Sequence, residues 1–476
     1  MIEIISNDTL YTYNLYHITK AFLPGSDIKQ KVDEEQESLV RVKLEGGSCF
    51  SIEKDEVKLC NTRQEKKAYV TKRIYEILKE ETGRTLAWGT LTGVRPTKLI
   101  MQKMEAGLSE EETEAFLREE HYVSEEKISL GIDIAKREKS LLERLDYKDG
   151  YSLYIGIPFC PSICSYCSFS SSPVHEWKDK MDMYLDALCK EVSAVAINMK
   201  HKKLNTIYIG GGTPTTLSAG QLDRLLGLVC SEFDFSDLIE FTVEAGRPDS
   251  ITRKKLEVIS SYPVTRISVN PQTMQQKTLD AVGRRHTVED IYNVFNMARE
   301  LGFDNINMDL IAGLPGENED DMKDTLSKIE SLHPDSLTVH ALAIKRTARL
   351  NKENYEVDMN SCITTMVDDA AESACKMGLK PYYLYRQKNI AGNFENVGYA
   401  EVDKAGIYNI LIMEEKQTII ATGAGSCTKV VLPCKEIMSN GKLSNIVRIE
   451  NVHNIMEYIE RIDEMIDRKG EVLWQR

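Results

Sequence analysis

The middle of the chain alternates short apolar runs with longer amphipathic stretches. The apolar runs are rich in β-branched residues and predict strands at 153–157, 205–209, 240–244, 264–269, 305–311 and 336–341. The stretches between them predict helices at 179–199, 219–232, 251–260, 288–301 and 317–331. Strands that alternate with helices predict βαβ units and a parallel sheet. Six such strands favour a partial or complete barrel over an open doubly wound sheet. In both architectures, ligands bind beyond the carboxyl ends of the strands.

The regions before and after this repeat have mixed patterns. The first predicts strands at 38–44 and 48–54, followed by helices at 66–80, 110–119 and 125–145. The last predicts strands at 382–386, 408–413 and 418–422 and a closing helix at 454–468. We therefore predict an α/β protein with a (β/α)6 core, an N-terminal α+β domain and a C-terminal α+β extension. The predicted boundaries of these three parts are 1–148, 149–344 and 345–476.

Composition and charge narrow the function classes. The 476 residues carry a formal net charge of −14, which argues against general binding to nucleic acid or to an anionic membrane. A hydrophobic content of 42% is sufficient for a large core. Residues 1–10 lack the apolar segment of a signal peptide, and no run reaches the about 18 apolar residues that a membrane span needs. We expect a soluble cytoplasmic protein.

Three of the 11 cysteines lie close together, directly after the first predicted strand of the repeat. Cys160, Cys164 and Cys167 have the spacing C-x3-C-x2-C, and three thiolates on one loop can converge on zinc, copper(I) or an iron–sulfur cluster. A structural zinc site normally has a fourth ligand, and neither Cys189 nor His175 belongs to a second paired motif. A 4Fe–4S cluster with three protein ligands would leave one iron open to a small molecule. Buried structural cysteines are a second alternative to zinc, and the interpretation that remains is the 4Fe–4S cluster.

A glycine run ends the second predicted strand. Residues 210–213 read Gly-Gly-Gly-Thr, and glycines allow the backbone to approach a ligand because no Cβ is in the way. The alternative is a tight turn between strand and helix that needs a positive φ.

Polar residues also follow the later strands. Glu244 closes the third strand, Gln272 follows the fourth, and Asp309 lies inside the apolar run of the fifth. A charge embedded in such a run is costly unless it is paired or bound to a ligand. The carboxylate of Glu244 could accept from an ammonium group or a ribose hydroxyl of a ligand. Glu244 and Asp309 could instead pair with Arg266 or Arg284 in a structural network.

The cysteine spacing after the first strand of a six-fold repeat resembles the radical S-adenosylmethionine (SAM) enzymes. The segments Tyr154-x-x-x-Pro-Phe-Cys, Gly210-Gly-Gly-Thr-Pro214 and Asp309-Leu-Ile-Ala-Gly-Leu-Pro315 resemble the oxygen-independent coproporphyrinogen III oxidase-like family. Residues 154–159, together with the segments 385–389 and 395–399, resemble its HemZ branch. The resemblance covers about residues 150–476, and residues 1–148 resemble the extra domain of that branch.

This resemblance implies a 4Fe–4S cluster and SAM as cofactors, bound by the core at 149–344. SAM in this family chelates the open iron, and one electron cleaves its sulfonium to give a 5′-deoxyadenosyl radical. The resemblance implies Cys160, Cys164 and Cys167 as the metal ligands. The implied SAM contacts are Gly211, Gly212, Thr213, Glu244, Gln272, Arg284, Asp309, the backbone of Ala343, and Tyr166 near the adenine or a second SAM. Tyr154 matches a catalytic tyrosine on the substrate or SAM side, with a core tyrosine as its alternative.

The implied reaction is the oxidative decarboxylation of coproporphyrinogen III propionates to vinyl groups, towards protoporphyrinogen IX, in porphyrin and haem biosynthesis. The implied electron donor is a reduced flavodoxin or ferredoxin. An acidic protein needs a local basic pocket for the propionates of this tetrapyrrole, and the C-terminal region at 345–476 would cap the substrate side. The basic candidates, or else solvated surface charges, are Lys345, Arg346, Arg349, Arg386 and Lys388.

Two departures from the family pattern keep other functions open. The family's oxidases carry a histidine where this chain has Gly156 and a fourth cysteine where it has Phe169. The alternatives are a haem- or porphyrin-binding carrier and a radical SAM enzyme that acts on another tetrapyrrole. In the first domain, residues 88–98 combine glycine, proline and basic residues. They predict either an anion-binding turn or a turn that leads into a helix.

Overall fold

The computed structural model describes residues 1–343, 348–352, 362–386, 395–438, 441 and 443–474. The chain divides into two compact units. The N-terminal unit consists of Met1–Lys136 and Tyr385–Glu395, and the barrel unit consists of Arg137–Leu384 and Asn396–Arg476. The chain therefore leaves the barrel unit at Leu384 and returns to it at Asn396.

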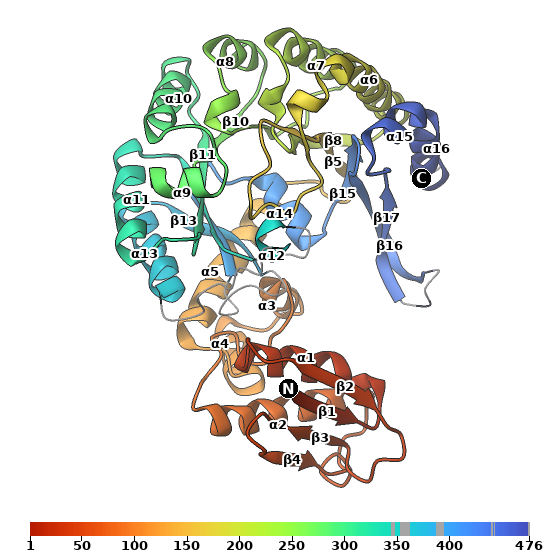
Figure 1. Cartoon of the computed structure of the whole chain (residues 1–476). Helices are drawn as coiled ribbons and strands as arrows, with labels where there is room; N and C mark the ends of the chain where they lie inside the picture. The colour runs from red at the N-terminus through yellow and green to blue at the C-terminus, as the bar shows by residue number, and fades with distance from the viewer. Residues whose placement is uncertain (344–347, 353–361, 387–394, 439–440, 442, 475–476) are drawn as a thin grey trace. The chain divides into compact units, whose positions relative to one another are not determined.

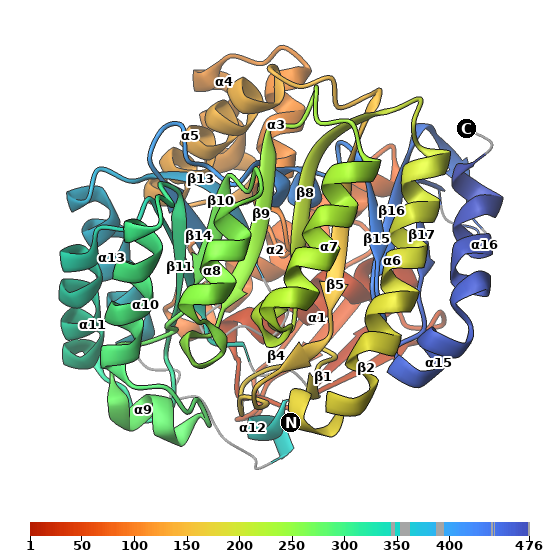
Figure 2. The ribbon, with the colours of Figure 1, turned by 90° about the horizontal axis from the view of Figure 1, so that it is seen from above.

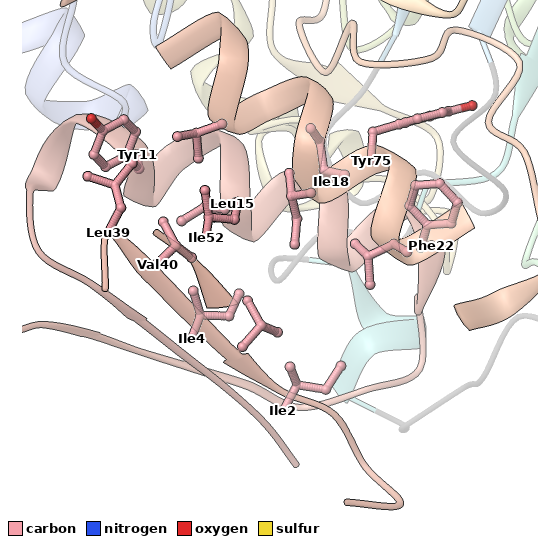
Figure 3. Packing of buried hydrophobic residues seen from close by; sticks show 14 of the residues in the cluster. Ile2, Ile4, Tyr11, Leu15, Ile18, Phe22, Leu39, Val40, Ile52 and Tyr75 are labelled. Carbon is pink, nitrogen blue, oxygen red and sulfur yellow. The ribbon is translucent and has the colours of Figure 1, made fainter. Parts of the chain in front are cut away.

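The N-terminal unit contains a four-stranded sheet in the order β2-β1-β3-β4, in which β1 is parallel to β2 and antiparallel to β3. Its strands are β1 (Ile2–Ser6), β2 (Ile28–Val32), β3 (Val40–Lys43) and β4 (Cys49–Ile52). Helices α1 (Thr9–Phe22) and α2 (Arg63–Thr82) pack on it. Figure 3 shows the strand residues Ile2, Ile4 and Val40 facing Leu15 and Phe22 of α1. The period of two in β1 and the spacing of three to four in α1 bring these apolar faces together.

Further helices follow in this part of the chain, and the last of them continues past Lys136 into the barrel unit. They are α3 (Pro96–Glu105), α4 (Glu110–Ala115), the π-helical turn η1 (Phe116–Glu120) and α5 (Glu125–Leu142). The turn at residues 88–95 leads into α3, which has Pro96 at its first position. Within this unit, the indole nitrogen of Trp88 donates to Glu395 over 2.8 Å, and Lys127 pairs with the same carboxylate over 2.8 Å. This turn therefore holds a carboxylate of the unit's own second segment.

The barrel unit has an 11-stranded sheet in the order β13-β14-β12-β11-β10-β9-β8-β5-β15-β16-β17. All six strands that the sequence predicts for the repeat are present, and neighbours among them are parallel. They are β5 (Gly150–Ile157), β8 (Lys203–Gly211), β9 (Glu240–Gly246), β10 (Arg266–Val269), β11 (Ile306–Ala312) and β12 (Ser336–Ala341). The predicted (β/α)6 partial barrel is confirmed.

Strands from the C-terminal part of the chain extend both edges of this sheet. They are β13 (Lys380–Arg386), β14 (Glu395–Ala400), β15 (Thr418–Thr422), β16 (Cys427–Ile437) and β17 (Leu443–Glu450). Strand β14 runs antiparallel to β12, and β15 runs parallel to β5. The C-terminal strands therefore continue the core sheet, and a separate short pair, β6 (Phe159–Cys160) and β7 (Ser172–Pro173), lies in the cysteine segment.

Helices cover the outer face of the barrel sheet, where Figure 2 shows α6, α7, α8 and α10 side by side. The helices of this unit are α6 (Met181–Asn198), α7 (Ala219–Glu232), α8 (Arg253–Ser260), α9 (Gln276–Ala281), α10 (Val288–Glu300), α11 (Glu319–Leu332), α12 (Arg349–Lys352), α13 (Cys362–Lys376), α14 (Ile407–Glu414), α15 (Ile455–Glu460) and α16 (Ile462–Leu473). Short 3₁₀ turns are η2 (Val174–Glu176), η3 (Lys178–Lys180), η4 (Pro214–Thr216) and η5 (Pro248–Ser250). No helix in the described ranges is both long and apolar enough to cross a membrane.

Helix α14 corrects one prediction. The apolar run at 408–413 is helical, not a strand, and it lies on the inner side of the curved sheet in Figure 1. The carboxylate of Glu240 accepts from the backbone N–H groups of Ile407 and Tyr408, which satisfies donors at the helix start. A short apolar run does not distinguish a buried helix from a buried strand, so the period of the sequence was not decisive. The predicted closing helix is present as two helices, α15 and α16.

Candidate functional site

The inner face of the barrel sheet carries polar and aromatic side chains. In register, Tyr154 lies beside Tyr208, and Asp309 lies beside Thr338. The ring centroids of Tyr154 and Tyr208 are 6.2 Å apart, and those of Tyr208 and Tyr408 are 4.5 Å apart. Because Tyr408 belongs to α14, these tyrosines lie on the same side of the sheet as that helix. Ligands in such folds bind at the carboxyl ends of these strands, where the cysteine loop begins.

The cysteine loop is held in place by backbone contacts. The N–H of Cys167 donates to the carbonyl of Cys164 over 3.1 Å, which folds the loop tightly. The N–H of Ser165 donates to Val282 over 3.1 Å, and the hydroxyl of Ser162 donates to Gly283 over 2.8 Å. All three cysteines are free thiols, and Cys164 is buried.

The donor set suits iron–sulfur chemistry. Among the described residues, no three His, Cys, Asp or Glu side chains are grouped so that they could hold a single metal ion. A 4Fe–4S cluster does not need such convergence, because each thiolate binds an iron of its own. Burial raises the pKa of Cys160, and it raises that of Cys167 to about 11. Ligation must therefore release protons from these thiols.

The glycine run lies directly against this loop. The N–H of Gly212 donates to Ile157 over 2.8 Å, and the N–H of Thr213 donates to Phe159 over 2.7 Å. A Cβ on Gly212 would lie 2.5 Å from the carbonyl oxygen of Phe159 and 3.0 Å from the sulfur of Cys160. Gly211 has a φ of +114°. The run therefore makes close approach possible and also forms a turn with positive φ, so both sequence interpretations apply to it.

Glu244 lies at the end of β9, inside the barrel unit. The hydroxyl of Tyr208 donates to its carboxyl group. Burial raises the pKa of Glu244 to about 7, and the charge of Asp309 adds to this rise. In the described part of the chain, neither Glu244 nor Asp309 forms a salt bridge with an arginine. The structural network with Arg266 or Arg284 that the sequence left open is therefore not formed by direct ion pairs.

Gln272 and Asp309 are brought together by their backbones. The N–H of Gln272 donates to the carbonyl of Asp309, and the N–H of Ile311 donates to the carbonyl of Gln272, both over 2.9 Å. Gln272 has a φ of +70°, a conformation that is costly for a residue with a side chain and that is typical of functional sites. Its Oε1 atom is buried without a hydrogen-bond partner. The carboxylate of Asp309 accepts from Asn307 over 2.8 Å.

Arg284 connects this region to the cysteine loop. Its Nη1 atom donates to the hydroxyl of Tyr166 over 3.2 Å and lies 3.9 Å from the sulfur of Cys164. Its Nη2 atom donates to the carbonyl of Asn270. The Nε atom of Arg284 and the Oδ1 atom of Asn270 are buried without partners. Tyr166 packs against an apolar cluster that includes Leu342, and burial raises its pKa.

These unpartnered atoms provide a test of whether a ligand fits. A buried polar group without a hydrogen bond costs about 1–3 kcal/mol. Such atoms also occur elsewhere in the described residues, for example on Asn7 and Thr19 of the N-terminal unit, so the relevant feature here is that several lie together. Here Gln272, Arg284 and Asn270 each have one, and all three follow β10 near the cysteine loop. A small polar molecule with several donors and acceptors, such as SAM, fits this set.

Three other predicted residues have fewer contacts with the cysteine loop. Tyr154 lies in the aromatic row and faces inward, 6.3 Å from Tyr408 between ring centroids. Ala343 follows β12 and is half-buried. Arg349 is exposed on α12, and the next residue, Leu350, donates its N–H to Ser165 of the cysteine loop over 3.0 Å.

Four basic candidates remain, of which the structure describes only Arg386. Arg386 belongs to the N-terminal unit, where its guanidinium donates to the carbonyl of Leu91. Lys345, Arg346 and Lys388 lie outside the described residues.

Sequence reasoning missed two residues that contact this site. Arg247 is buried after β9 and contacts the cysteine loop, although a charge between glycine and proline is typical of a surface loop. Tyr208 precedes the glycine run by two residues, and the period of two in a strand would have indicated that it shares the face of Gly210.

The fold and the cysteine loop define a radical SAM protein, and sequence comparisons agree. Residues 154–329 match the Radical SAM superfamily. A Bacillus subtilis protein described as oxygen-independent coproporphyrinogen-III oxidase-like protein HemZ is 42% identical over 405 residues, which are 84% of this chain and 79% of that protein. This chain therefore belongs to the radical SAM superfamily and, within it, to the oxygen-independent coproporphyrinogen III oxidase-like family, in the HemZ branch.

Two further relatives match the barrel region. The Heme chaperone HemW of Bacillus subtilis is 37% identical over 41% of this chain and 51% of its own length. The oxygen-independent coproporphyrinogen III oxidase of Escherichia coli is 34% identical over 40% of this chain and 41% of its own length. The solved structure of coproporphyrinogen III oxidase (HemN) from Escherichia coli aligns with a TM-score of 0.53 at 21% identity, over 69% of this chain and 73% of that chain. It supports the fold assignment.

Membership of this superfamily makes the chain a SAM-dependent enzyme in class. Its cofactors are those of the superfamily, a 4Fe–4S cluster and S-adenosylmethionine. The cysteine loop and the unpartnered polar atoms after β10 are compatible with both.

Proposed function

We propose that this protein converts propionate side chains of coproporphyrinogen III to the vinyl groups of protoporphyrinogen IX without oxygen. Each conversion removes one hydrogen atom, which ends on 5′-deoxyadenosine, and releases CO2, and it passes one electron to an external electron acceptor. The observation that carries the SAM-dependent part of the proposal is the group of buried, unpartnered polar atoms on Gln272, Arg284 and Asn270 beside the cysteine loop. Similarity to the HemZ protein over 84% of this chain supports the tetrapyrrole as the substrate class.

The proposal gives each residue a role. Cys160, Cys164 and Cys167 would hold the cluster, and the backbone at Gly211, Gly212 and Thr213 would follow the methionine part of SAM. When bound, the cluster and SAM supply a carbon radical that abstracts hydrogen from the substrate.

The residues after the later strands would orient SAM. Arg284 and Gln272 would supply a donor and an acceptor, and Glu244 and Asp309 would accept from hydroxyl or ammonium groups. Ala343 would contribute its backbone, and Tyr166 would lie near the adenine. Tyr154, inside the barrel unit, would face the substrate.

A second candidate function rests on Gly156. A Cβ at this position would lie 3.1 Å from the carbonyl oxygen of Thr422 and 3.3 Å from the ring of Tyr154. The site is therefore closely surrounded where the family's oxidases carry a histidine, and no imidazole is available there to donate a proton or hold a propionate. This observation favours a haem- or porphyrin-binding carrier, a role that the name of the relative HemW also suggests.

One anaerobic experiment separates the two candidates. The protein is reconstituted with iron and sulfide, and a reductant, SAM and coproporphyrinogen III are added. We expect porphyrinogens lighter by one and two carboxyl groups, formed in step with 5′-deoxyadenosine and detected by mass spectrometry. Tight haem binding without any lighter product would favour the carrier instead. Deoxyadenosine without either result would indicate another tetrapyrrole as substrate.

The cysteine assignment has a matched control within the chain. We expect Cys164→Ala to abolish deoxyadenosine formation, whereas Cys189→Ala, a buried cysteine on α6, should retain it. Equal activity of the two variants would contradict the assignment.

The proposal also includes a reduced flavodoxin or ferredoxin as electron donor and a cytoplasmic location, where such reductants are available.

A further inference from the structure

Arg247 is a buried arginine that contacts the cysteine loop. It follows β9, and only 4% of its surface is exposed. Its Nη1 atom donates to the carbonyl oxygen of Ser162 over 2.8 Å and to the hydroxyl of Ser162 over 2.9 Å. The same nitrogen lies 3.6 Å from the sulfur of Cys164. One guanidinium nitrogen therefore contacts both the backbone of the loop and its central cysteine.

The opposite side of this guanidinium is fixed by a carboxylate. The Nε and Nη2 atoms of Arg247 donate to the two oxygens of Asp249 over 3.0 and 2.6 Å. Such a bidentate pair holds the guanidinium in one plane and orients its remaining nitrogen. A buried ion pair of this kind contributes little net stability, because desolvation of the two charges offsets their attraction. The two hydrogen bonds to Asp249 explain how the Nη1 atom of Arg247 stays directed at the cysteine loop.

Two buried guanidinium groups therefore approach the sulfur of Cys164. Arg284 approaches its sulfur to 3.9 Å from the segment after α9, and Arg247 approaches it to 3.6 Å from the segment after β9. Arg284 already has a proposed role in orienting SAM. Arg247 has no such role and is available for a different one.

We propose that Arg247 is a positioning residue that holds the Cys164 thiolate and raises the reduction potential of the cluster which that thiolate binds. The proposal rests on the cluster assignment within the proposed function and is independent of the substrate. Hydrogen bonds to a ligand sulfur and nearby positive charge favour the reduced state, since reduction adds negative charge to the cluster. Asp249 has the opposite influence, because its carboxylate offsets part of the charge of Arg247.

The test is a redox titration of the reconstituted protein, followed by electron paramagnetic resonance of the reduced cluster. In Arg247→Met we expect the ratio of reduced to oxidised cluster at a fixed potential to fall about tenfold, which corresponds to a midpoint lower by about 59 mV. Arg247→Lys keeps the positive charge but loses the bidentate contact with Asp249. Its midpoint potential should lie between those of Arg247→Met and the unsubstituted protein. Asp249→Asn should shift the midpoint in the opposite direction.

The control is Arg253→Met, which removes an exposed arginine of α8 that pairs with Glu300. Its midpoint should equal that of the unsubstituted protein. Iron and sulfide content is measured for every variant, so that loss of the cluster is distinguished from a shift in its potential.

Three results would overturn the proposal. Midpoints of Arg247→Met and Arg247→Lys within a few millivolts of the unsubstituted protein would mean that Arg247 has a purely structural role. A downward shift in Asp249→Asn would contradict the electrostatic explanation, and this arm stays informative if Arg247→Met loads no cluster. An unsubstituted protein that binds no cluster would overturn it together with the proposed function, whereas a loaded protein without porphyrinogen turnover would overturn only the proposed reaction.

Discussion

The sheet of the N-terminal unit packs its helices through apolar side chains, whereas the inner face of the barrel sheet carries charged groups and tyrosines. In the N-terminal unit, a continuous cluster from Ile2 to Leu78 joins β1 and β3 to α1 and α2 (Figure 3). In the barrel unit, the strands place Glu244, Asp309 and Arg266 on the inner face.

This difference indicates that the barrel unit is the one that binds ligands. Apolar burial stabilises a unit by about 25 cal/mol per Å² without need of any ligand. Buried polar atoms without partners reduce stability, and those on Gln272 and Arg284 lie beside the cysteine loop. We therefore expect changes in the N-terminal core to reduce stability, and changes on the inner face of the barrel to reduce binding with little loss of stability.

The largest expected effect is on the stability of the N-terminal unit. Leu15→Ala removes a side chain that is 1% exposed, and the transfer and cavity terms together should cost about 3 kcal/mol. Hydrogen exchange of residues 1–82, followed by mass spectrometry, measures this local opening. The control is Leu59→Ala, whose side chain is 93% exposed and should cost less than about 0.5 kcal/mol. Equal protection in both variants would contradict the assignment of Leu15 to a packed core.

The second prediction concerns Arg284, where we expect a loss of SAM binding with little loss of stability. Arg284→Met removes the buried Nε atom that has no partner in the protein, and we expect SAM affinity to fall roughly 100-fold, about 2.7 kcal/mol. Equilibrium dialysis of the reconstituted protein measures the affinity. The neighbouring Arg285 is exposed, and Arg285→Met should bind SAM normally. If Arg284→Met unfolded the protein instead, the buried polar groups beside the cysteine loop would be structural and the comparison would fail.

The third prediction concerns Glu395, a carboxylate of the N-terminal unit that accepts from both a buried lysine and an indole. Glu395→Gln weakens the contacts of Glu395 with Trp88 and Lys127, and should cost the N-terminal unit about 2 kcal/mol. The control, Glu110→Gln, breaks an exposed pair with Lys136 and should cost about 0.5 kcal/mol. Hydrogen exchange of residues 84–124 measures both. Equal costs would mean that burial of this ion pair has no consequence.

The repeat and the cysteine loop could be predicted from the sequence because their signals are local. Each parallel strand is a short apolar run, and the three cysteines lie within eight residues of one another. Helix α14 could not be predicted, since its cap, Glu240, is 167 positions away in the chain. Strand β2 has the sequence Ile-Lys-Gln-Lys-Val and is largely exposed at the edge of its sheet, so it has no apolar face to indicate it.

In the candidate site, too, residues with a local signal could be predicted and residues with distant contacts could not. Glu244, Gln272 and Asp309 were predicted because polar residues at strand ends stand out against apolar runs. Arg247 was missed because its contacts, Ser162 and Cys164, lie 85 and 83 positions earlier. The three unpartnered atoms after β10 depend on how the backbone folds there, and the sequence carries no sign of which atoms remain without partners.

The smallest expected effect is a pH dependence of SAM binding that arises from Glu244. Burial raises the pKa of this carboxyl to about 7, so the group is mostly neutral at pH 6 and mostly ionised at pH 8. A neutral carboxyl is a weaker acceptor than a carboxylate, so we expect SAM affinity to rise up to about tenfold between these two values. In Glu244→Gln the affinity should be lower at pH 8 and nearly constant with pH. The control Glu257→Gln, at an exposed position on α8, should keep the full dependence. An affinity that falls as the pH rises would mean that the protonated carboxyl donates to SAM, and the inner face of the barrel would then bind through donors at this position.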